Sequence, residues 1–362
     1  MDVIRYFPAD YRSARAGFLD AARAAGAHIE TFDNPAPAPD GRPVHTDVAV
    51  LGDPAAERLL LVNSGTHGGE GFCGSGCIVG WLRSGRHRLL PANVRAVLVH
   101  AINPHGFAWI RRVTEDNVDL NRNFVDHAAG AWPANPEYGG LHAAILPARW
   151  DAAGRAGMEA SLAAYMAKHG AFALQAALSR GQYDHADGIF YGGRAATWSN
   201  RTFRAVVDGF CRQAAHIAFL DIHTGLGPYG HAELIARFTR DSPEESRLRR
   251  WFGEGLTSPE AGDSTSPPLT GLIADGLIGG CPGADVVSLT VEYGTYPIRR
   301  ILGALLADNW LHVRGDVHSD LGRAVKAEMR VCFYPDEADW KELVWLRARQ
   351  VLDRAAAGLA AI

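Results

Sequence analysis

One glycine-rich stretch, residues 59–71, constrains this chain more than any other. It opens with the apolar run 59–62, which predicts a buried strand of a mixed or parallel sheet, and a turn signal at 63–65 ends that strand. His67 and Glu70 follow among glycines that let a backbone pass close to a ligand. Both would then lie just past the carboxyl end of a strand, where ligands bind in open α/β sheets. Such a pair is half of a zinc site, although a polar turn with a solvated Glu explains this stretch alone equally well.

Composition sets the class of protein. The 362 residues are 47% apolar and 21% charged, which suffices for a large core, and the length is compatible with one large α/β domain. A formal charge of −4 argues against nucleic-acid binding. The five cysteines are an odd number and include no CxxC pair, which argues against a disulfide framework and favours a reducing compartment. With no signal-peptide pattern and no apolar run of membrane-spanning length, we expect a cytoplasmic protein that does not contact a membrane.

The order of predicted elements indicates an α/β fold with a mixed, largely parallel twisted sheet flanked by helices. We predict one domain over 1–362 that includes N-terminal edge elements (1–45), a helical insertion (about 127–213) and C-terminal helices (about 300–362). Strands are predicted at 28–32, 46–51, 59–63, 94–102, 216–222 and 286–291, and helices at 11–25, 73–82, 159–179 and 341–359. We expect 46–51 and 59–63 to form an edge hairpin and 258–283 to be an irregular loop.

Polar side chains stand at the ends of several predicted strands: His67 with Glu70, then Asn103, His223 and Glu292. Each alone could be a core histidine bonded to backbone or a carboxylate facing water. Several at one rim of a sheet indicate a site. Catalytic zinc takes three protein ligands and keeps one open position. His67, Glu70 and His223 meet that need and leave Glu292 free as a general base.

The segment 111–124 adds groups that hold anions. It contains Arg111, Arg112 and Arg122, and the guanidinium fork matches a carboxylate geometrically. Charge alone would also fit a solvated loop, so this segment supports a site only together with the strand ends.

Five motifs, taken in order, resemble the zinc carboxypeptidase family, whose broader group includes the aspartoacylase-like deacylases. The match spans roughly 44–300 with a helical insertion after 126, and two runs, Asp-Leu-Asn-Arg-Asn-Phe and Leu-Gly-Pro-Tyr-Gly, look most similar to an uncharacterised carboxypeptidase-like branch. The motifs are Thr-His67-Gly-Gly-Glu70, Asn103-Pro-His-Gly-Phe107, Asp119-Leu-Asn121-Arg122-Asn123-Phe124, Leu-Asp-Ile-His223-Thr and Leu-Thr-Val-Glu292.

The resemblance implies one Zn²⁺ per chain, with His67, Glu70 and His223 as its ligands and Glu292 as the general base. Arg112 would polarise the scissile carbonyl and hold the oxyanion, with Arg111 as the alternative.

By the same resemblance, Asn121 and Arg122 would bind a substrate carboxylate, and Asp119 would orient His67 through its second ring nitrogen. One departure affects specificity, because carboxypeptidases carry a mobile Tyr on a loop about two dozen residues before the base. Here that loop, 267–276, has no Tyr. Tyr229 or Tyr191 could fill the space, although a packed aromatic explains either residue as well.

The leading interpretation is a zinc-dependent hydrolase of the metallocarboxypeptidase type. It would cleave an amide bond, peptide or N-acyl, in a small peptide or N-acyl amino acid that carries a carboxylate. The alternatives are an aspartoacylase-type N-deacylase, a catalytically inactive zinc-binding module, and a nucleotide-binding oxidoreductase. The last rests on the glycines between Gly74 and Gly80, which do not form GxGxxG and are better explained by close helix–sheet packing. The oligomeric state is left open.

Overall fold

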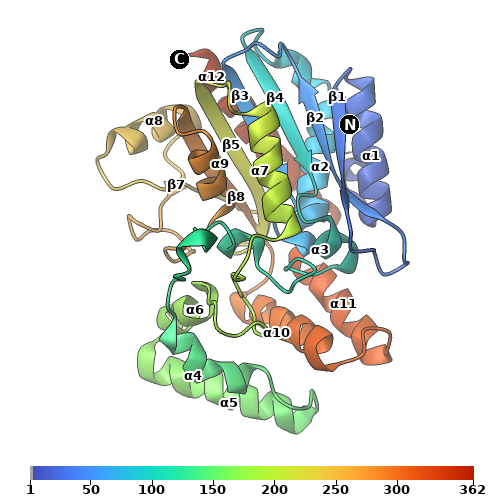
Figure 1. Cartoon of the computed structure of the whole chain (residues 1–362), viewed down its shortest axis with the longest axis vertical. Helices are drawn as coiled ribbons and strands as arrows, with labels where there is room; N and C mark the ends of the chain where they lie inside the picture. The colour runs from blue at the N-terminus through green and yellow to red at the C-terminus, as the bar shows by residue number, and fades with distance from the viewer. Residues whose placement is uncertain (1–2) are drawn as a thin grey trace.

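The central strands of one sheet organise the molecule. The computed structural model describes residues 3–362, and within them eight strands form a single sheet in the order β1-β2-β4-β3-β5-β8-β6-β7. The four central strands run parallel (Figure 1): β4 (Val94–His100), β3 (Arg58–Ser64), β5 (His216–Gly225) and β8 (Asp285–Gly294). Their nearly continuous apolar sequences suit strands covered on both faces. The predicted mixed, largely parallel α/β fold is confirmed.

Antiparallel strands close the sheet at both edges. β1 (His28–Asn34) pairs with β2 (Val44–Leu51), and β2 pairs in turn with β4. The predicted hairpin between 46–51 and 59–63 is therefore wrong, because β4 lies between those two strands. At the other edge β6 (Ala232–Ile235) is antiparallel to β8 and parallel to β7 (Leu256–Thr257).

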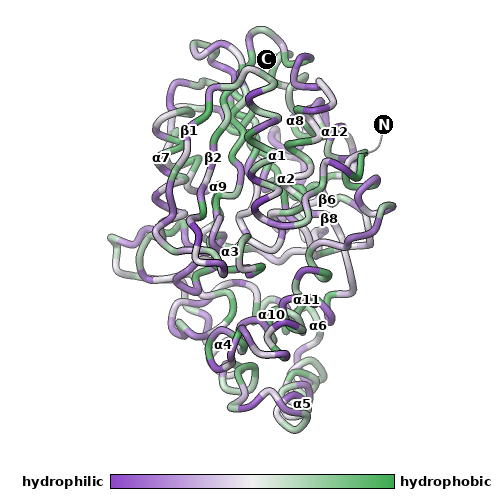
Figure 2. The backbone as a smooth tube through the Cα atoms, turned by 90° about the vertical axis from the view of Figure 1, so that its right-hand side faces the viewer, coloured by the Kyte–Doolittle hydropathy of each residue, from purple (hydrophilic) through white to green (hydrophobic). Residues whose placement is uncertain are grey.

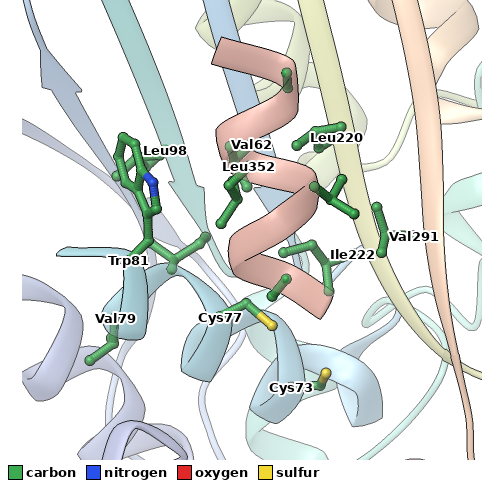
Figure 3. Packing of buried hydrophobic residues seen from close by; sticks show 14 of the residues in the cluster. Val62, Cys73, Cys77, Val79, Trp81, Leu98, Leu220, Ile222, Val291 and Leu352 are labelled. Atoms are coloured by element: carbon green, nitrogen blue, oxygen red, sulfur yellow. The ribbon is translucent and has the colours of Figure 1, made fainter. Parts of the chain in front are cut away.

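Helices from the N-terminal part, the interior and the C-terminal end of the chain cover one face of the sheet. They are α1 (Tyr11–Ala24), α2 (Gly71–Arg83), α8 (Pro243–Phe252) and α12 (Ala338–Ala360). Figure 3 shows α2 and α12 meeting the strands, and Leu352 of α12 belongs to the same apolar cluster as Val62 of β3 and Leu220 of β5. A Cβ added at Gly76 would lie 2.3 Å from the Phe7 ring, and one at Gly80 would lie 2.5 Å from the Trp345 ring. These two glycines therefore allow close packing against the N-terminal segment and α12, and not against the sheet as predicted. The predicted helix–sheet approach occurs at Gly74, where a Cβ would lie 2.5 Å from Cβ of Ser64 in β3.

Two further helices cover the opposite face: α7 (Trp198–Phe210) and α9 (Ile273–Gly280). α7 lies inside the range predicted for the insertion, yet it packs on the sheet as the helix leading into β5. α9 lies in the range predicted as an irregular loop. Its eight residues include three glycines, so local sequence favoured a loop, and burial of Ile273 and Leu277 on the sheet outweighs that preference.

The insertion forms a layer beyond the ends of the strands, drawn below the sheet in Figure 1. α4 (Pro136–Ile145), α5 (Ala152–His169) and α6 (Ala171–Ser179) pack with α10 (Ile298–Arg314) and α11 (Asp320–Phe333). The single helix predicted over 159–179 is two helices, because Gly170 has a φ of 90°. Figure 2 shows α5 at the end of the molecule opposite the C-terminus.

Short helical turns complete the chain. They are η1 (Ile4–Tyr6), η2 (Gly68–Glu70), η3 (Arg86–Leu89), α3 (Pro104–Trp109), η4 (Leu120–Arg122) and η5 (His127–Ala129). Among residues 3–362, none of the helices combines the length and the apolar character that crossing a membrane requires.

Candidate metal centre and its cavity

A tight turn after β3 fixes the first two candidate ligands. The N–H of Gly68 donates to the carbonyl of Arg112, and the N–H of Gly69 donates to the carbonyl of Arg111. A Cβ at Gly68 would lie 1.9 Å from the carbonyl carbon of Gly106, so this position accepts only glycine. The turn is thereby pressed against 106–112, and His67 and Glu70 face the carboxyl ends of the strands.

Three side chains converge there. Nδ1 of His67 lies 2.9 Å from Oε1 of Glu70, Nδ1 of His223 lies 2.9 Å from Oε2 of the same carboxylate, and the two Nδ1 atoms are 3.2 Å apart. All three residues are buried, and one candidate ligand atom from each lies within 4.8 Å of the others. The structure thus brings the three predicted ligands together. Two imidazoles and one Glu are a known set of ligands for catalytic zinc.

The outer nitrogen of each imidazole faces a carboxylate of its own. Nε2 of His67 is 3.1 Å from Oδ1 of Asp119, and Nε2 of His223 is 2.6 Å from Oδ2 of Asp221. An N–H donated to a carboxylate places the ring lone pair on Nδ1, which is the tautomer a metal ligand needs. The donor set therefore fits a zinc ion.

Asp221 is the functional residue that the sequence analysis did not assign. Its Oδ1 accepts hydrogen bonds from Asn63 and Thr66, each at 2.8 Å, which fixes the carboxylate against His223. A signal existed, because residues two apart on a strand point to the same face and Asp221 precedes His223 by two on β5.

Charge within the cluster shifts several pKa values. Burial alone would raise the pKa of Glu70, but the imidazoles of His67 and His223 bring it below its usual range. Burial would lower the pKa of His223, but Asp221 and then Glu70 hold it well above its usual value. Burial likewise opposes ionisation of Asp119, and Arg112 together with His67 overcomes it to leave the pKa well below normal. The cluster is thus a buried set of mutually compensating charges.

Glu292 stands beside the cluster. It is the register partner of His223 on the neighbouring strand β8, and its Oε1 accepts a 2.9 Å hydrogen bond from the N–H of Leu226. Burial, and then the nearby carboxylate of Glu70, raise the pKa of Glu292 to about 8. A carboxylate with such a pKa can both take and return a proton near neutral pH.

Of the two adjacent arginines, Arg112 faces the cluster. Its Nε donates to Oδ2 of Asp119 at 2.8 Å, its Nη1 lies 3.6 Å from Oε1 of Glu70, and its guanidinium stacks on Phe190. Arg111 points away and bonds Asn117 and Asp308.

Arg122 and Asn121 line the same space. The guanidinium of Arg122 is buried and donates three hydrogen bonds, two to the carbonyl of Ser179 and one to that of Asn121. Two of its five N–H groups remain available. The carboxylate of Asp275, on the nearby helix α9, is bonded to Arg237 and not to Arg122. The amide oxygen of Asn121 accepts from the N–H of Ile273.

The two tyrosines lie elsewhere. The hydroxyl of Tyr229 bonds Asp339, 38% of the residue is exposed, and it is not among the residues that line the cavity beside the cluster. Tyr191 contributes its carbonyl to the N–H of Asp119. Asn103 caps α3 and donates to the carbonyl of Arg112, so it supports the arginine backbone.

One cavity joins these groups. It has a volume of about 510 Å³, within the range typical of small-molecule sites. The polar residues that line it at the cluster include His67, Glu70, Arg112, Asn121, Arg122, Asp221, His223 and Glu292.

Comparisons with known proteins give one family match and several structural matches. A family model described as "Protein of unknown function (DUF2817)" matches residues 7–347. A search of curated proteins gives no match.

Solved structures that match include carboxypeptidase A from Helicoverpa armigera (13% identity, 91% of this chain and 74% of that chain, TM-score 0.46) and thrombin activatable fibrinolysis inhibitor (11%, 98% and 75%, 0.49). Murein-tripeptide amidase MpaA from Escherichia coli O157 matches as well (16%, 79% and 91%, 0.32). At these identities the likeness concerns the fold, and the chemistry is inferred from the residues of this chain.

Proposed function

Because the chain belongs to the DUF2817 family, whose description leaves its function open, we propose an activity from the site: zinc-dependent hydrolysis of an amide bond in a substrate that carries a carboxylate. The observation that carries this proposal is the convergence of two Nδ1 atoms and one carboxylate in a cavity that also holds Glu292 and Arg112. His67, Glu70 and His223 would hold the zinc. When bound, zinc supplies Lewis-acid polarisation and a lowered pKa for water.

Proton transfer, oxyanion stabilisation and substrate binding are assigned to three residues of the chain. Glu292 takes the proton of the attacking water and then delivers it to the leaving amine, a dual role suited to its raised pKa. Arg112 is fixed by Asp119 beside Glu70, where its guanidinium can stabilise an oxyanion. The two unused N–H groups of Arg122 can receive the substrate carboxylate.

A zinc-binding module without activity is the second candidate. It would need no base, whereas Glu292 and Arg112 both reach the cavity. Peptides and N-acyl amino acids remain alternative substrates for the same chemistry, and a turnover assay separates them.

The test begins with the metal and the base. We expect about one zinc per chain by elemental analysis, and sharply lower occupancy in His67→Ala and His223→Ala, because each removes one of three ligands. Glu292→Gln should retain zinc and lose about 10²–10⁴-fold in kcat on a panel of N-acyl amino acids and dipeptides. Glu254→Gln, at a side chain 86% exposed, is the matched control.

Three results would each contradict a different part of the proposal: the ligands, the base or the activity. Full zinc in both histidine variants would refute the ligand assignment. A Glu292→Gln protein that loses metal but keeps its rate per zinc would make Glu292 a ligand. A zinc-loaded protein inactive on the whole panel would favour the binding module. Assaying each substrate also as its C-terminal amide tests the carboxylate, since the capped forms should react many-fold more slowly.

A further inference from the structure

The cavity beside the metal cluster has a second wall that amide hydrolysis does not require. Side chains of α5, α6 and α10 make up this wall, so it combines the insertion with a helix more than a hundred residues later in the chain. We call it the apolar lobe; its members are Met158, Leu162, Met166, Phe172, Leu174, Leu178, Ile298, Ile301, Leu302 and Leu305.

The apolar lobe is incompletely covered by protein. Phe172 is 60% exposed, Ile298 is 49% exposed and Met166 is 43% exposed, although each lines the cavity. Large apolar side chains gathered around an open cavity indicate a ligand that removes them from water. The lobe is continuous with the cluster, so that ligand belongs to the substrate.

Hydrogen bonding selects the kind of ligand. Four polar or charged side chains of the same helices reach the cavity, and two of them, Glu159 and Arg299, are exposed to water. The other two are engaged within the protein: the amide of Gln175 donates to the carbonyl of Thr265, and the hydroxyl of Ser179 donates to the carbonyl of Gln175. The carbonyl of Ser179 already accepts from Arg122. A peptide brings a donor and an acceptor with each residue, and burying them unpaired is costly. An aliphatic chain brings neither.

We propose, on the basis of the proposed function, that the substrate is an amino acid acylated on nitrogen by an aliphatic chain, and that this acyl chain occupies the apolar lobe. The scissile carbonyl would then face the metal cluster, and the carboxylate of the amino acid would face Arg122. Water adds its oxygen to the acyl carbon, the C–N bond breaks, and the amine takes up the proton. The products are a fatty acid and a free amino acid.

Binding to Glu292→Gln tests the proposal without turnover. Calorimetry should show affinity rising with acyl length from acetyl to dodecanoyl, by up to about fourfold per methylene (about 0.8 kcal/mol) until the lobe is filled. In wild type, kcat/KM should follow the same order. Equal affinity for acetyl and dodecanoyl forms, or a dipeptide with apolar side chains binding as tightly as the dodecanoyl form, would overturn the proposal.

Substitutions in the apolar lobe test whether the acyl chain binds there. Leu162→Trp, at a half-buried lobe position, should lower affinity for the dodecanoyl substrate at least tenfold and leave the acetyl substrate unchanged. Leu321→Trp, at a leucine 39% exposed on α11 and outside the cavity, should change neither. Phe172→Ser removes apolar surface at an exposed position. It should also lower the affinity for the dodecanoyl substrate, without destabilising the fold. Unchanged affinities in both lobe variants would refute the assignment.

The two proposals fail separately. Length-dependent binding to a protein that hydrolyses nothing would refute the enzyme and retain the lobe as a lipid-binding cavity. Zinc-dependent hydrolysis without length dependence would retain the enzyme and refute the lobe.

Discussion

Each histidine of the cluster is held from two sides. Glu70 faces the Nδ1 atoms of both rings, while Asp119 and Asp221 each face one Nε2 atom. The aspartates therefore decide which nitrogen carries the proton, and through it whether the inner nitrogens can bind a metal.

Asp221→Asn tests this role. The new amide can turn an N–H toward Nε2 of His223, which favours the tautomer with the proton on Nδ1 and removes the lone pair needed by zinc. We expect zinc affinity to fall about 10- to 100-fold, measured by competition with a chelator, with the fold unchanged by circular dichroism. Asp33→Asn removes a carboxylate from an exposed His–Asp pair with His45 and serves as control. Equal zinc affinity in the two variants would mean that Asp221 is structural only.

At the scale of elements, the turn η2 depends on one glycine. Gly68 contacts the backbone of Gly106, whereas the nearest atom to a Cβ at Gly69 would be Cβ of Phe333 at 3.8 Å, an ordinary contact. Two adjacent glycines therefore differ in what they tolerate.

Gly68→Ala should separate the turn from α3 and shift both His67 and Glu70. We expect a loss of about 1–3 kcal/mol or more in the free energy of unfolding, as for overpacked cores, together with weaker zinc binding. Gly69→Ala should be close to neutral in urea denaturation and in zinc content. If Gly68→Ala were equally neutral, the turn would not be what positions the ligands.

For the whole molecule, a buried histidine outside the site links stability to pH. His100 is fully buried at the end of β4, stacks on Phe18, and its Nε2 lies 3.0 Å from the hydroxyl of Ser75. Burial lowers the pKa of His100 to about 4. The unfolded chain therefore binds this proton at a higher pH than the folded chain does.

The sign follows from linkage: as pH falls from about 6.5 toward 4, the unfolded state gains the proton first and stability decreases. One such group can account for about 3 kcal/mol over that interval. His100→Leu should flatten the pH dependence of the free energy of unfolding by about this amount, measured by urea denaturation at pH 7 and pH 4.5. His318→Leu, at an exposed position, controls for loss of an imidazole as such. Parallel curves for wild type and His100→Leu would contradict the prediction.

Local patterns were enough for the fold class and for the candidate ligands. Apolar runs mark buried strands because burial on both faces excludes polar residues, and the polar groups that follow such runs meet because parallel strands end at one rim. For that reason the sequence alone is enough to name His67, Glu70, His223 and Glu292 as candidates.

The tertiary structure alone decided what depends on segments distant in sequence. Arg111 and Arg112 are adjacent and chemically identical, and only the packing of 106–112 against η2 turns Arg112 toward the cluster. Tyr229 points to Asp339 because α12 passes beside it.

The same distinction holds for strand order and for the cavity. No local pattern reveals that β4 pairs with β2 or that α9 is held by burial against the sheet. The apolar lobe joins helices of 152–179 to α10. A sequence records which residues are apolar, whereas a cavity is a relation between surfaces that only folding brings face to face.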